Sequence, residues 1–199
     1  MAIKPILFNT EMVRAILDGR KDATRGIVKG FIPDDAVWGY TAFTPKGYIS
    51  CRGTFADGYG EKFFKLPCEP GDILYVRETW KKAPNGYYYY EDWQRNDIAD
   101  VTKWQPSIRM PKEAARIWLK VTNVRVERLQ EISAESALAE GADKYIHTNG
   151  GLDENMTITS FIGIWNSTIK KADLDRYGWD ANPYVWTIEF ERCEKPEEV

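Results

Sequence analysis

The chain has 199 residues, of which 43% are hydrophobic and 29% charged, a composition that predicts one globular domain and excludes a disordered or low-complexity chain. The net charge of −3 argues against non-specific electrostatic binding of nucleic acid. Residues 1–30 and 104–128 nevertheless carry net charges of +3 and +4 and could form a locally basic face. Aromatic residues reach 14%, which indicates a large-residue core, a stacking surface or both.

Cysteine and histidine usage excludes several kinds of site. Cys51, Cys68 and Cys193 are odd in number and far apart, unlike a disulfide framework or a CxxC metal site, and they fit a reduced, cytoplasmic setting. The single histidine, His147, excludes a histidine-based catalytic triad, and no metal or cofactor is expected. No signal-peptide core and no run of membrane-spanning length is found, so no membrane contact is expected.

The first half of the chain predicts one helix among short strands. A strand at residues 6–8 precedes a helix over 11–18, which Thr10 caps and Gly19 ends. Residues 30–47 predict a long loop, and residues 48–55 and 62–66 predict a hairpin around Asp57-Gly58. A strand over 73–80 follows, and residues 81–106 predict a single strand within a long excursion.

The second half predicts two long strands and two helices. The apolar positions of the strand 116–129 change phase, which indicates a bulge near Asn123. Ser133 and Gly141 bound a short helix, and a second helix presents a stripe of apolar residues at Ile158, Ile162, Trp165 and Ile169. In the last strand, Tyr184, Trp186, Ile188 and Phe190 should face inward, with Thr187, Glu189 and Glu191 outward.

These elements predict an α+β fold. Six or seven strands and about three flanking helices occur without βαβ alternation, which favours a strongly bent or barrel-like mixed sheet. Residues 1–193 form the predicted domain, with insertions near 30–70 and 82–106, and residues 194–199 form a charged, flexible tail.

The polar turn after the first helix is one candidate for chemistry. Lys21 and Thr24 are three residues apart, so that their head groups could converge, and Arg25 follows directly. Burial or a neighbouring cation would lower the pKa of the lysine, and a neutral lysine could take the proton of the threonine hydroxyl. The alternative is an ordinary helix-exit turn with solvated charges.

Glu78 is the second candidate. It shares a strand face with Leu74, Val76 and Trp80, so an inward face would bury its carboxylate near the end of the strand. A buried carboxylate must pair with a cation or stay protonated, and either outcome suits an acid–base role. The alternatives are a structural ion pair and an outward-facing side chain.

Several motifs together resemble the ASCH-domain proteins, which belong to the PUA-like barrel superfamily. They are, in chain order, Gly19-x-Lys21-x-x-Thr24-Arg25, the block Pro70–Trp80, the strand from Leu119 with Arg125–Ile132, and the closing strand Tyr184–Phe190. With the segment Trp104–Pro111, the chain is most similar to the longer members that phages and prophages encode. The resemblance spans nearly the whole chain.

This resemblance implies a small mixed barrel with a cleft for RNA or a modified nucleoside. One ASCH branch hydrolyses the amide of N4-acetylcytidine, and its Lys/Thr pair matches Lys21 and Thr24. Its Glu lies two residues beyond Glu78, on the same strand face, and its Arg lies one residue beyond Arg25. The roles implied are Lys21 as base, Thr24 as nucleophile and Glu78 as proton donor, with Arg25 orienting the substrate.

A non-catalytic cleft for RNA or single-stranded nucleic acid is the alternative function. In that case aromatic side chains of the insertions would stack on bases, and basic side chains would contact phosphates or the ligand. The candidates are Tyr88, Trp93 and Trp104 for stacking, with Arg77 and Arg109 as further binding residues. The same aromatics could instead form a hairpin packed on the barrel. A nuclease ranks last, because no dense carboxylate cluster is visible.

Overall fold

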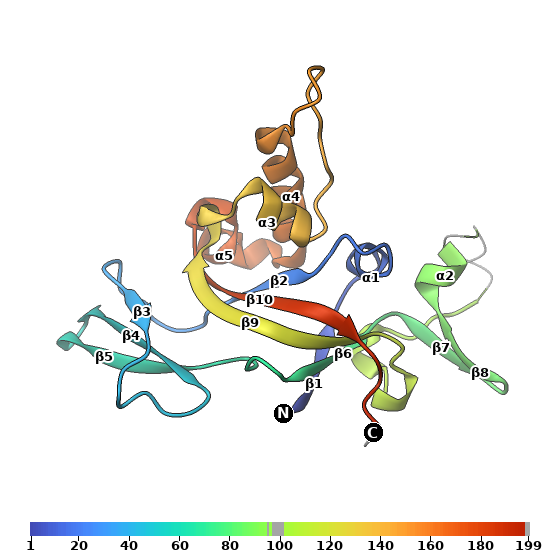
Figure 1. The fold of residues 1–199 in the computed structure, drawn as a ribbon, viewed down its shortest axis with the longest axis horizontal. Coiled ribbons are helices and arrows are strands. Elements are labelled where there is room, and N and C mark those ends of the chain that lie inside the picture. The colour runs from blue at the N-terminus through green and yellow to red at the C-terminus, as the bar shows by residue number, and fades with distance from the viewer. Residues whose placement is uncertain (95, 97–101, 198–199) are drawn as a thin grey trace.

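The computed structural model describes residues 1–94, 96 and 102–197, and its central element is a mixed five-stranded sheet. The strands lie in the order β1 (Ile3–Leu7), β6 (Ile73–Arg77), β9 (Trp118–Arg128), β10 (Tyr184–Cys193) and β2 (Ala23–Ile27). β1 and β6 are parallel, whereas the other neighbours are antiparallel. Figure 1 shows α3, α4 and α5 on one side of the long strands β9 and β10. The predicted α+β class is confirmed.

The ladder between β9 and β10 contains the bend that the sequence predicts. Val121 pairs with Phe190 and Asn123 with Glu189, so Thr122 is the extra residue of β9 in this register. An extra residue of this kind turns the following side chains to the other face and increases the local twist. The predicted bulge is confirmed, and it curves the sheet around its core.

β1 and β2 are the two edges of this curved sheet. Among the described strands, the ladders run from β1 to β2 without joining these two, so the predicted barrel is an open sheet. Pro5 lies in β1, on an edge strand, where its missing N–H removes no ladder hydrogen bond.

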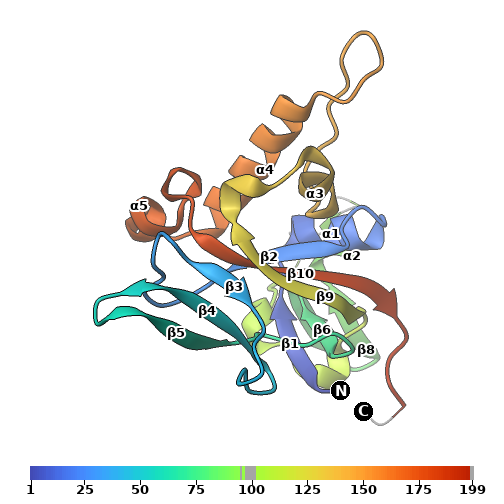
Figure 2. The same ribbon diagram turned by 60° about the vertical axis from the view of Figure 1, so that its left-hand side comes forward.

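Both predicted insertions contain small antiparallel sheets. The first holds β3 (Val37–Gly39), β4 (Tyr48–Phe55) and β5 (Gly58–Lys65), and its β4–β5 hairpin confirms the predicted turn. The second carries the hairpin of β7 (Trp80–Ala83) and β8 (Gly86–Tyr89), followed by α2 (Tyr90–Gln94). Figure 2 shows the three-stranded sheet beside the central one.

The strand count differs from the prediction at three places. Residues 23–27 were not predicted as a strand but form β2, which carries Thr24 and Arg25. The predicted strand 73–80 ends at Arg77, and the excursion forms the two strands β7 and β8 instead of one. The predicted loop 30–47 also contains β3. The described part of the chain therefore has ten strands instead of six or seven.

The helix boundaries largely follow their capping residues. Asn9 caps α1 (Thr10–Leu17) by accepting a hydrogen bond from the Met12 N–H at 2.9 Å, so the predicted Thr10 cap is wrong by one residue. Ser133 caps α3 (Ala134–Ala139), as predicted. Gly19 and Gly141 follow the two helices with φ of +72° and +93°, the left-handed region that glycine favours.

The predicted buried stripe of α4 (Glu154–Thr168) is only partly right. Its buried residues are Thr157, Phe161 and Trp165, and the flanking Ile158 and Ile162 are half-buried. The two ring systems, four residues apart, bury more apolar area than the isoleucines would, so they set the rotation of the helix. α5 (Leu174–Tyr177) follows α4, and no helix in the described residues is long and apolar enough to span a membrane.

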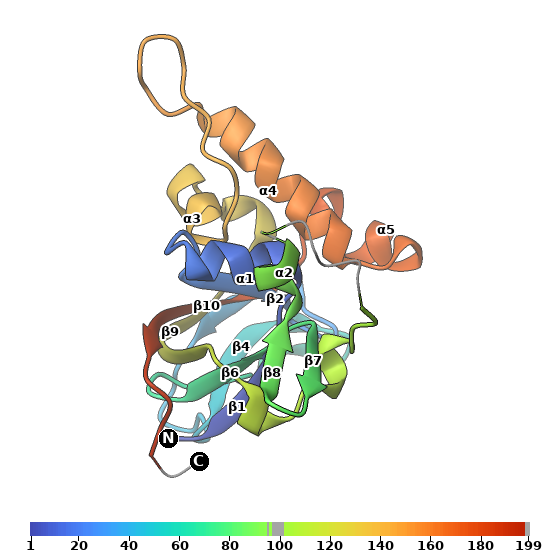
Figure 3. The same cartoon turned by 90° about the vertical axis from the view of Figure 1, so that its right-hand side faces the viewer.

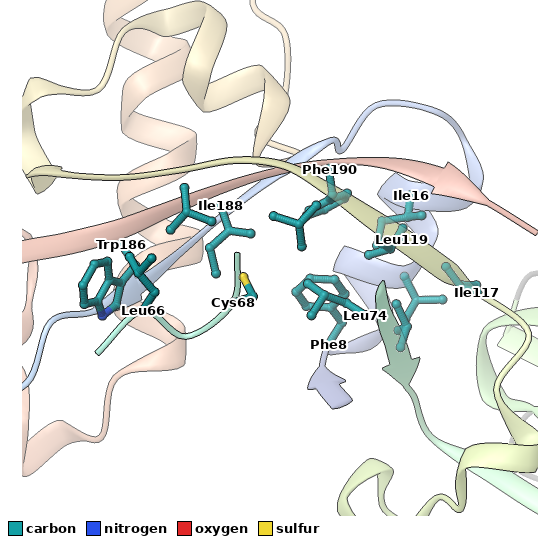
Figure 4. Packing of buried hydrophobic residues seen from close by; sticks show 14 of the residues in the cluster. Phe8, Ile16, Leu66, Cys68, Leu74, Ile117, Leu119, Trp186, Ile188 and Phe190 are labelled. Atoms are coloured by element: carbon teal, nitrogen blue, oxygen red, sulfur yellow. The ribbon is translucent and has the colours of Figure 1, made fainter. Parts of the chain in front are cut away.

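The main core fills the concave side of the sheet. Phe8, Leu74, Leu119, Ile188 and Phe190 converge there, as Figure 4 shows. A second cluster, which includes Phe161, Trp165 and Val185, lies under α4 on the other side of β10. Figure 3 shows α1, α3 and α4 stacked above the strands.

β10 is consequently buried on both faces, which corrects one prediction. Thr187, expected to face solvent, is 1% exposed. Arg25 and Arg125 flank it on the neighbouring strands, and it lines a small cavity together with Ser136 and Ala139 of α3. Alternation along a strand shows which residues share a face, but a second layer of helices can bury both faces.

Candidate functional site

Lys21 lies in the turn between α1 and β2, and its side chain is completely buried. The Lys21 Nζ donates to three oxygens: the carbonyl of Ala23 at 2.7 Å, the carbonyl of Glu140 at 2.9 Å and the Glu140 carboxylate at 3.0 Å. Burial lowers the pKa of the Lys21 ammonium, while the Glu140 carboxylate opposes that change. A protonated ammonium has three N–H donors, so the three acceptors match the charged form.

Arg25, which lies on β2, binds the same Glu140 carboxylate. Its Nη1 donates to Glu140 at 3.0 Å, and its Nε donates to Glu127 of β9 at 3.1 Å. The arrangement follows from the register, since Arg25, Thr187 and Arg125 lie side by side across β2, β10 and β9.

The ion pairs continue across this face to form a charge cluster. Arg125 pairs with Glu127 at 2.9 Å and also with Glu189 of β10. The charge cluster comprises three cations and three carboxylates: Lys21, Arg25, Arg125, Glu127, Glu140 and Glu189. Burial alone would raise the pKa of Glu127, but Arg25 and Arg125 hold it below its usual value. The cluster therefore carries balanced charge.

Thr24 points to the opposite face of β2 and lines a cavity of about 530 Å³. This β1–β2 cavity lies where the sheet is open, between its two edge strands. Its wall is formed by β1, the start of α1, β2, β10, the end of α3 and α4: Ile6, Leu7, Phe8, Asn9, Met12, Thr24, Arg25, Gly26, Glu140, Phe161, Ile164, Trp165, Ser167, Thr168 and Ile188. The volume is in the range of pockets that hold a small organic molecule.

The open edge of β2 also presents main-chain groups. Asp22 O accepts from Phe190 N and Val28 N donates to Tyr184 O, so the even-numbered residues of this segment form the ladder with β10. In an antiparallel pair, alternate residues direct their N–H and C=O away from the partner strand. The N–H and C=O of Arg25 therefore face the open edge.

Glu78 is buried just beyond the end of β6, and of the alternatives that the sequence left open it forms the ion pair. The guanidinium of Arg116 binds both carboxylate oxygens of Glu78 at 2.9 Å, and it also pairs with Asp92 at 2.8 Å. Burial raises the pKa of the Glu78 carboxyl, whereas Arg116 opposes the change. Among the described residues, no hydrogen bond or ion pair joins Glu78 to Lys21 or Thr24, and Glu78 does not line the β1–β2 cavity.

The predicted stacking residues pack against one another. Trp93 contacts Tyr88 and Trp104 edge to face, with ring centroids 6.0 and 5.5 Å apart. Arg77 donates to the carbonyls of Ile108 and Met110, which fixes the segment after the second insertion. Arg109 is exposed. These residues lie outside the wall of the β1–β2 cavity.

Sequence reasoning missed Glu140, although it joins Lys21 to Arg25. One signal was available, because Glu140 is the C-cap residue of the short helix α3, just before Gly141. A carboxylate is disfavoured at a helix C-terminus, so a glutamate there indicates an outside cation. Glu127 and Glu189 carry no such signal, since alternating charged residues are common on strands.

Comparisons with known proteins add no identification: no protein-family model, no curated protein and no solved structure matches the chain. Within the described ranges, no group of three or more histidine, cysteine, aspartate or glutamate residues could hold a metal ion. The site must therefore be interpreted from its own geometry.

Proposed function

We propose that this protein is an ASCH-like member of the PUA-like superfamily and that its β1–β2 cavity binds a nucleobase or nucleoside, free or within RNA. The single observation that carries the proposal is the position of the motif residues at this cavity. Thr24 and Arg25 line it, and Lys21 lies behind its wall, with the Nζ 5.5 Å from the ring centroid of Phe8.

The composition of the wall supports a flat, weakly polar ligand. Phe8, Phe161 and Trp165 supply ring surfaces, while Thr24 and Asn9 supply polar groups. Pockets for small molecules combine apolar walls with a few such groups. The open-edge N–H and C=O of Arg25 form a donor–acceptor pair that can read the edge of a base, as main-chain groups read one another in a sheet.

A cavity-filling variant tests the proposal. Gly26 lines the cavity, and no heavy atom lies within 4 Å of the position that a Cβ would take there, so Gly26→Val should fold and occupy ligand space. Gly60 of β5 has equally open surroundings away from the cavity, so Gly60→Val is the matched control. Calorimetry would measure the binding of N4-acetylcytidine, cytidine, uridine, adenosine and guanosine to each protein.

We expect at least one nucleoside to bind, with Gly26→Val weakening it by about tenfold or more and Gly60→Val leaving it unchanged. If no nucleoside and no short RNA binds the wild-type protein, the proposal is wrong. Equal binding by Gly26→Val and the wild type would place the ligand elsewhere.

Amide hydrolysis is the second candidate, and one geometric observation favours it. The Glu140 carboxylate lies 3.0 Å from the Lys21 Nζ and can take its proton, which leaves an amine able to accept the proton of the Thr24 hydroxyl. The Thr24 oxygen would then attack the acyl carbon of an N-acylated nucleoside, and the amide C–N bond would break as the leaving amine takes the proton held by Lys21. Water would hydrolyse the resulting Thr24 ester and release the carboxylic acid. Turnover of N4-acetylcytidine by the wild type, lost in Lys21→Ala and Thr24→Val, is the expected result. Equal turnover in Lys21→Ala would remove Lys21 as the base, and no turnover in the wild type would leave a binding protein.

A further inference from the structure

The charges around the β1–β2 cavity restrict what it can hold. Arg25 and Glu140 are the ionisable residues in its wall, and they are paired with each other at 3.0 Å. A ligand in this cavity therefore meets one positive and one negative group that already neutralise each other.

The groups behind the wall are balanced as well. Every cation of the charge cluster has a carboxylate partner, and the Lys21 Nζ uses all three donors of an ammonium. An anionic ligand could gain a cation only by displacing Glu127 or Glu140 from Arg25. That exchange would take from the displaced carboxylate one of its two cation partners, because Glu140 would keep only Lys21 and Glu127 only Arg125. Weakening a buried ion pair in this way is unfavourable.

The start of α1 is the one feature of the rim that would favour an anion. Asn9 and Met12, from its first turn, line the cavity, and a helix N-terminus has a positive partial charge. Asn9 already caps the Met12 N–H, however, and Glu11 adds a carboxylate to the same turn. This end of the helix is therefore also compensated.

We infer that the β1–β2 cavity selects an uncharged heteroaromatic ring and rejects ring derivatives that carry a negative charge. The inference rests on the proposed function and adds the charge state of the ligand to it. The polar groups that remain for a ligand are neutral: the hydroxyls of Thr24, Ser167 and Thr168, the Asn9 side-chain amide and the open-edge N–H and C=O of Arg25. The Ser167 and Thr168 hydroxyls already donate to main-chain carbonyls of α4, so they can only accept from a ligand. They suit a ring whose edge carries an adjacent donor and acceptor.

Matched ligands that differ only in charge test the inference. Uridine-5-carboxamide and uridine-5-carboxylate have nearly the same shape, and nicotinamide and nicotinate are a second such pair. Calorimetry with the wild-type protein at pH 7.5 should give at least about tenfold tighter binding for each amide. Placing the charge on the ring matters, because a 5′-phosphate could extend out of the open cavity into solvent.

A variant of the chain provides the converse experiment. Glu140→Gln removes the carboxylate that Arg25 and Lys21 share, so the carboxylate ligands should bind more tightly. The preference for the amides over the carboxylates should then become smaller or reverse. Glu191→Gln is the control: Glu191 pairs with Lys120 on the surface, outside the cavity wall, so its loss should leave the preference for the amides unchanged. If Glu140→Gln does not fold, the wild-type comparison decides alone.

The outcomes separate this inference from the function on which it rests. If nucleosides bind but the carboxylate of each pair binds as tightly as the amide, or more tightly, the inference is wrong and the proposed function stands. If no member of the panel and no unmodified nucleoside binds, both are overturned.

Discussion

Replacing Glu140 by alanine should destabilise the protein strongly, because this carboxylate serves two buried cations. Its side chain is 5% exposed, that of Lys21 is fully buried, and that of Arg25 is 1% exposed. The substitution leaves both cations in place and deletes the group that each of them contacts at 3.0 Å.

The size of the loss follows from the contacts that remain. Breaking a buried ion pair by removing one partner costs about 3–5 kcal/mol. In Glu140→Ala, the Lys21 Nζ keeps two main-chain acceptors and Arg25 keeps Glu127, so the lower end of that range, about 3 kcal/mol, is expected. For a chain of this length, each kcal/mol shifts the melting temperature by about 2–4 °C, which predicts a fall of about 6–12 °C.

Thermal and urea unfolding of three variants would measure this effect. Glu191 pairs with Lys120 at 3.6 Å on the surface, so Glu191→Ala should cost less than about 1 kcal/mol and is the control. Lys21→Met leaves Glu140 paired with Arg25, and the double variant with Glu140→Ala should be less damaging than the sum of the two. If Glu140→Ala and Glu191→Ala unfold at the same temperature, the buried-charge argument is wrong.

Two further outcomes follow from local geometry. Gly141→Ala should destabilise the protein more than Gly19→Ala, as measured by urea unfolding. Both glycines have positive φ, which costs a substituted alanine about 1–2 kcal/mol, but only at Gly141 would the new Cβ lie 2.9 Å from the Cβ of Ala15. Equal losses of stability would contradict this. Burial alone would raise the pKa of Asp72, but main-chain N–H groups and Lys4 hold it below its usual value. Asp72 therefore stabilises the fold at pH values above its unfolded pKa of about 3.9, and this contribution is lost as the pH falls through the lower folded pKa. Asp72→Asn should therefore be less stable at pH 7 and lose less stability on acidification; an unchanged pH slope would refute this.

Local patterns identified most of the elements near the site. Gly19, Ser133 and Gly141 correctly marked helix ends, and the phase change in β9 predicted a bulge near Asn123, one residue from its position at Thr122. These features depend on hydrogen bonds and steric limits within a few residues, so they can be read from a short window of sequence. Strand alternation is also local, but for Glu78 it gave only the residues that share its face and left open whether that face is buried.

Contacts between distant segments could not be predicted in this way. Glu140 reaches Lys21 across 119 residues, and Arg116 reaches Glu78 across 38. Whether Lys21 and Glu78 share a partner depends on how α3 and the second insertion pack on the sheet. The burial of Thr187 and the rotation of α4 were missed for the same reason, because the second layer decides which face is covered.

The sequence by itself determined the α+β class, the bend in the sheet and the position of Lys21, Thr24 and Arg25 after the first helix. Each of these follows from periodicity, capping or turn geometry, which act over a few neighbouring residues. The tertiary structure alone decided that the sheet stays open between β1 and β2 and that Glu140 neutralises both motif cations. Those outcomes depend on packing and on the desolvation of charges brought together from distant parts of the chain.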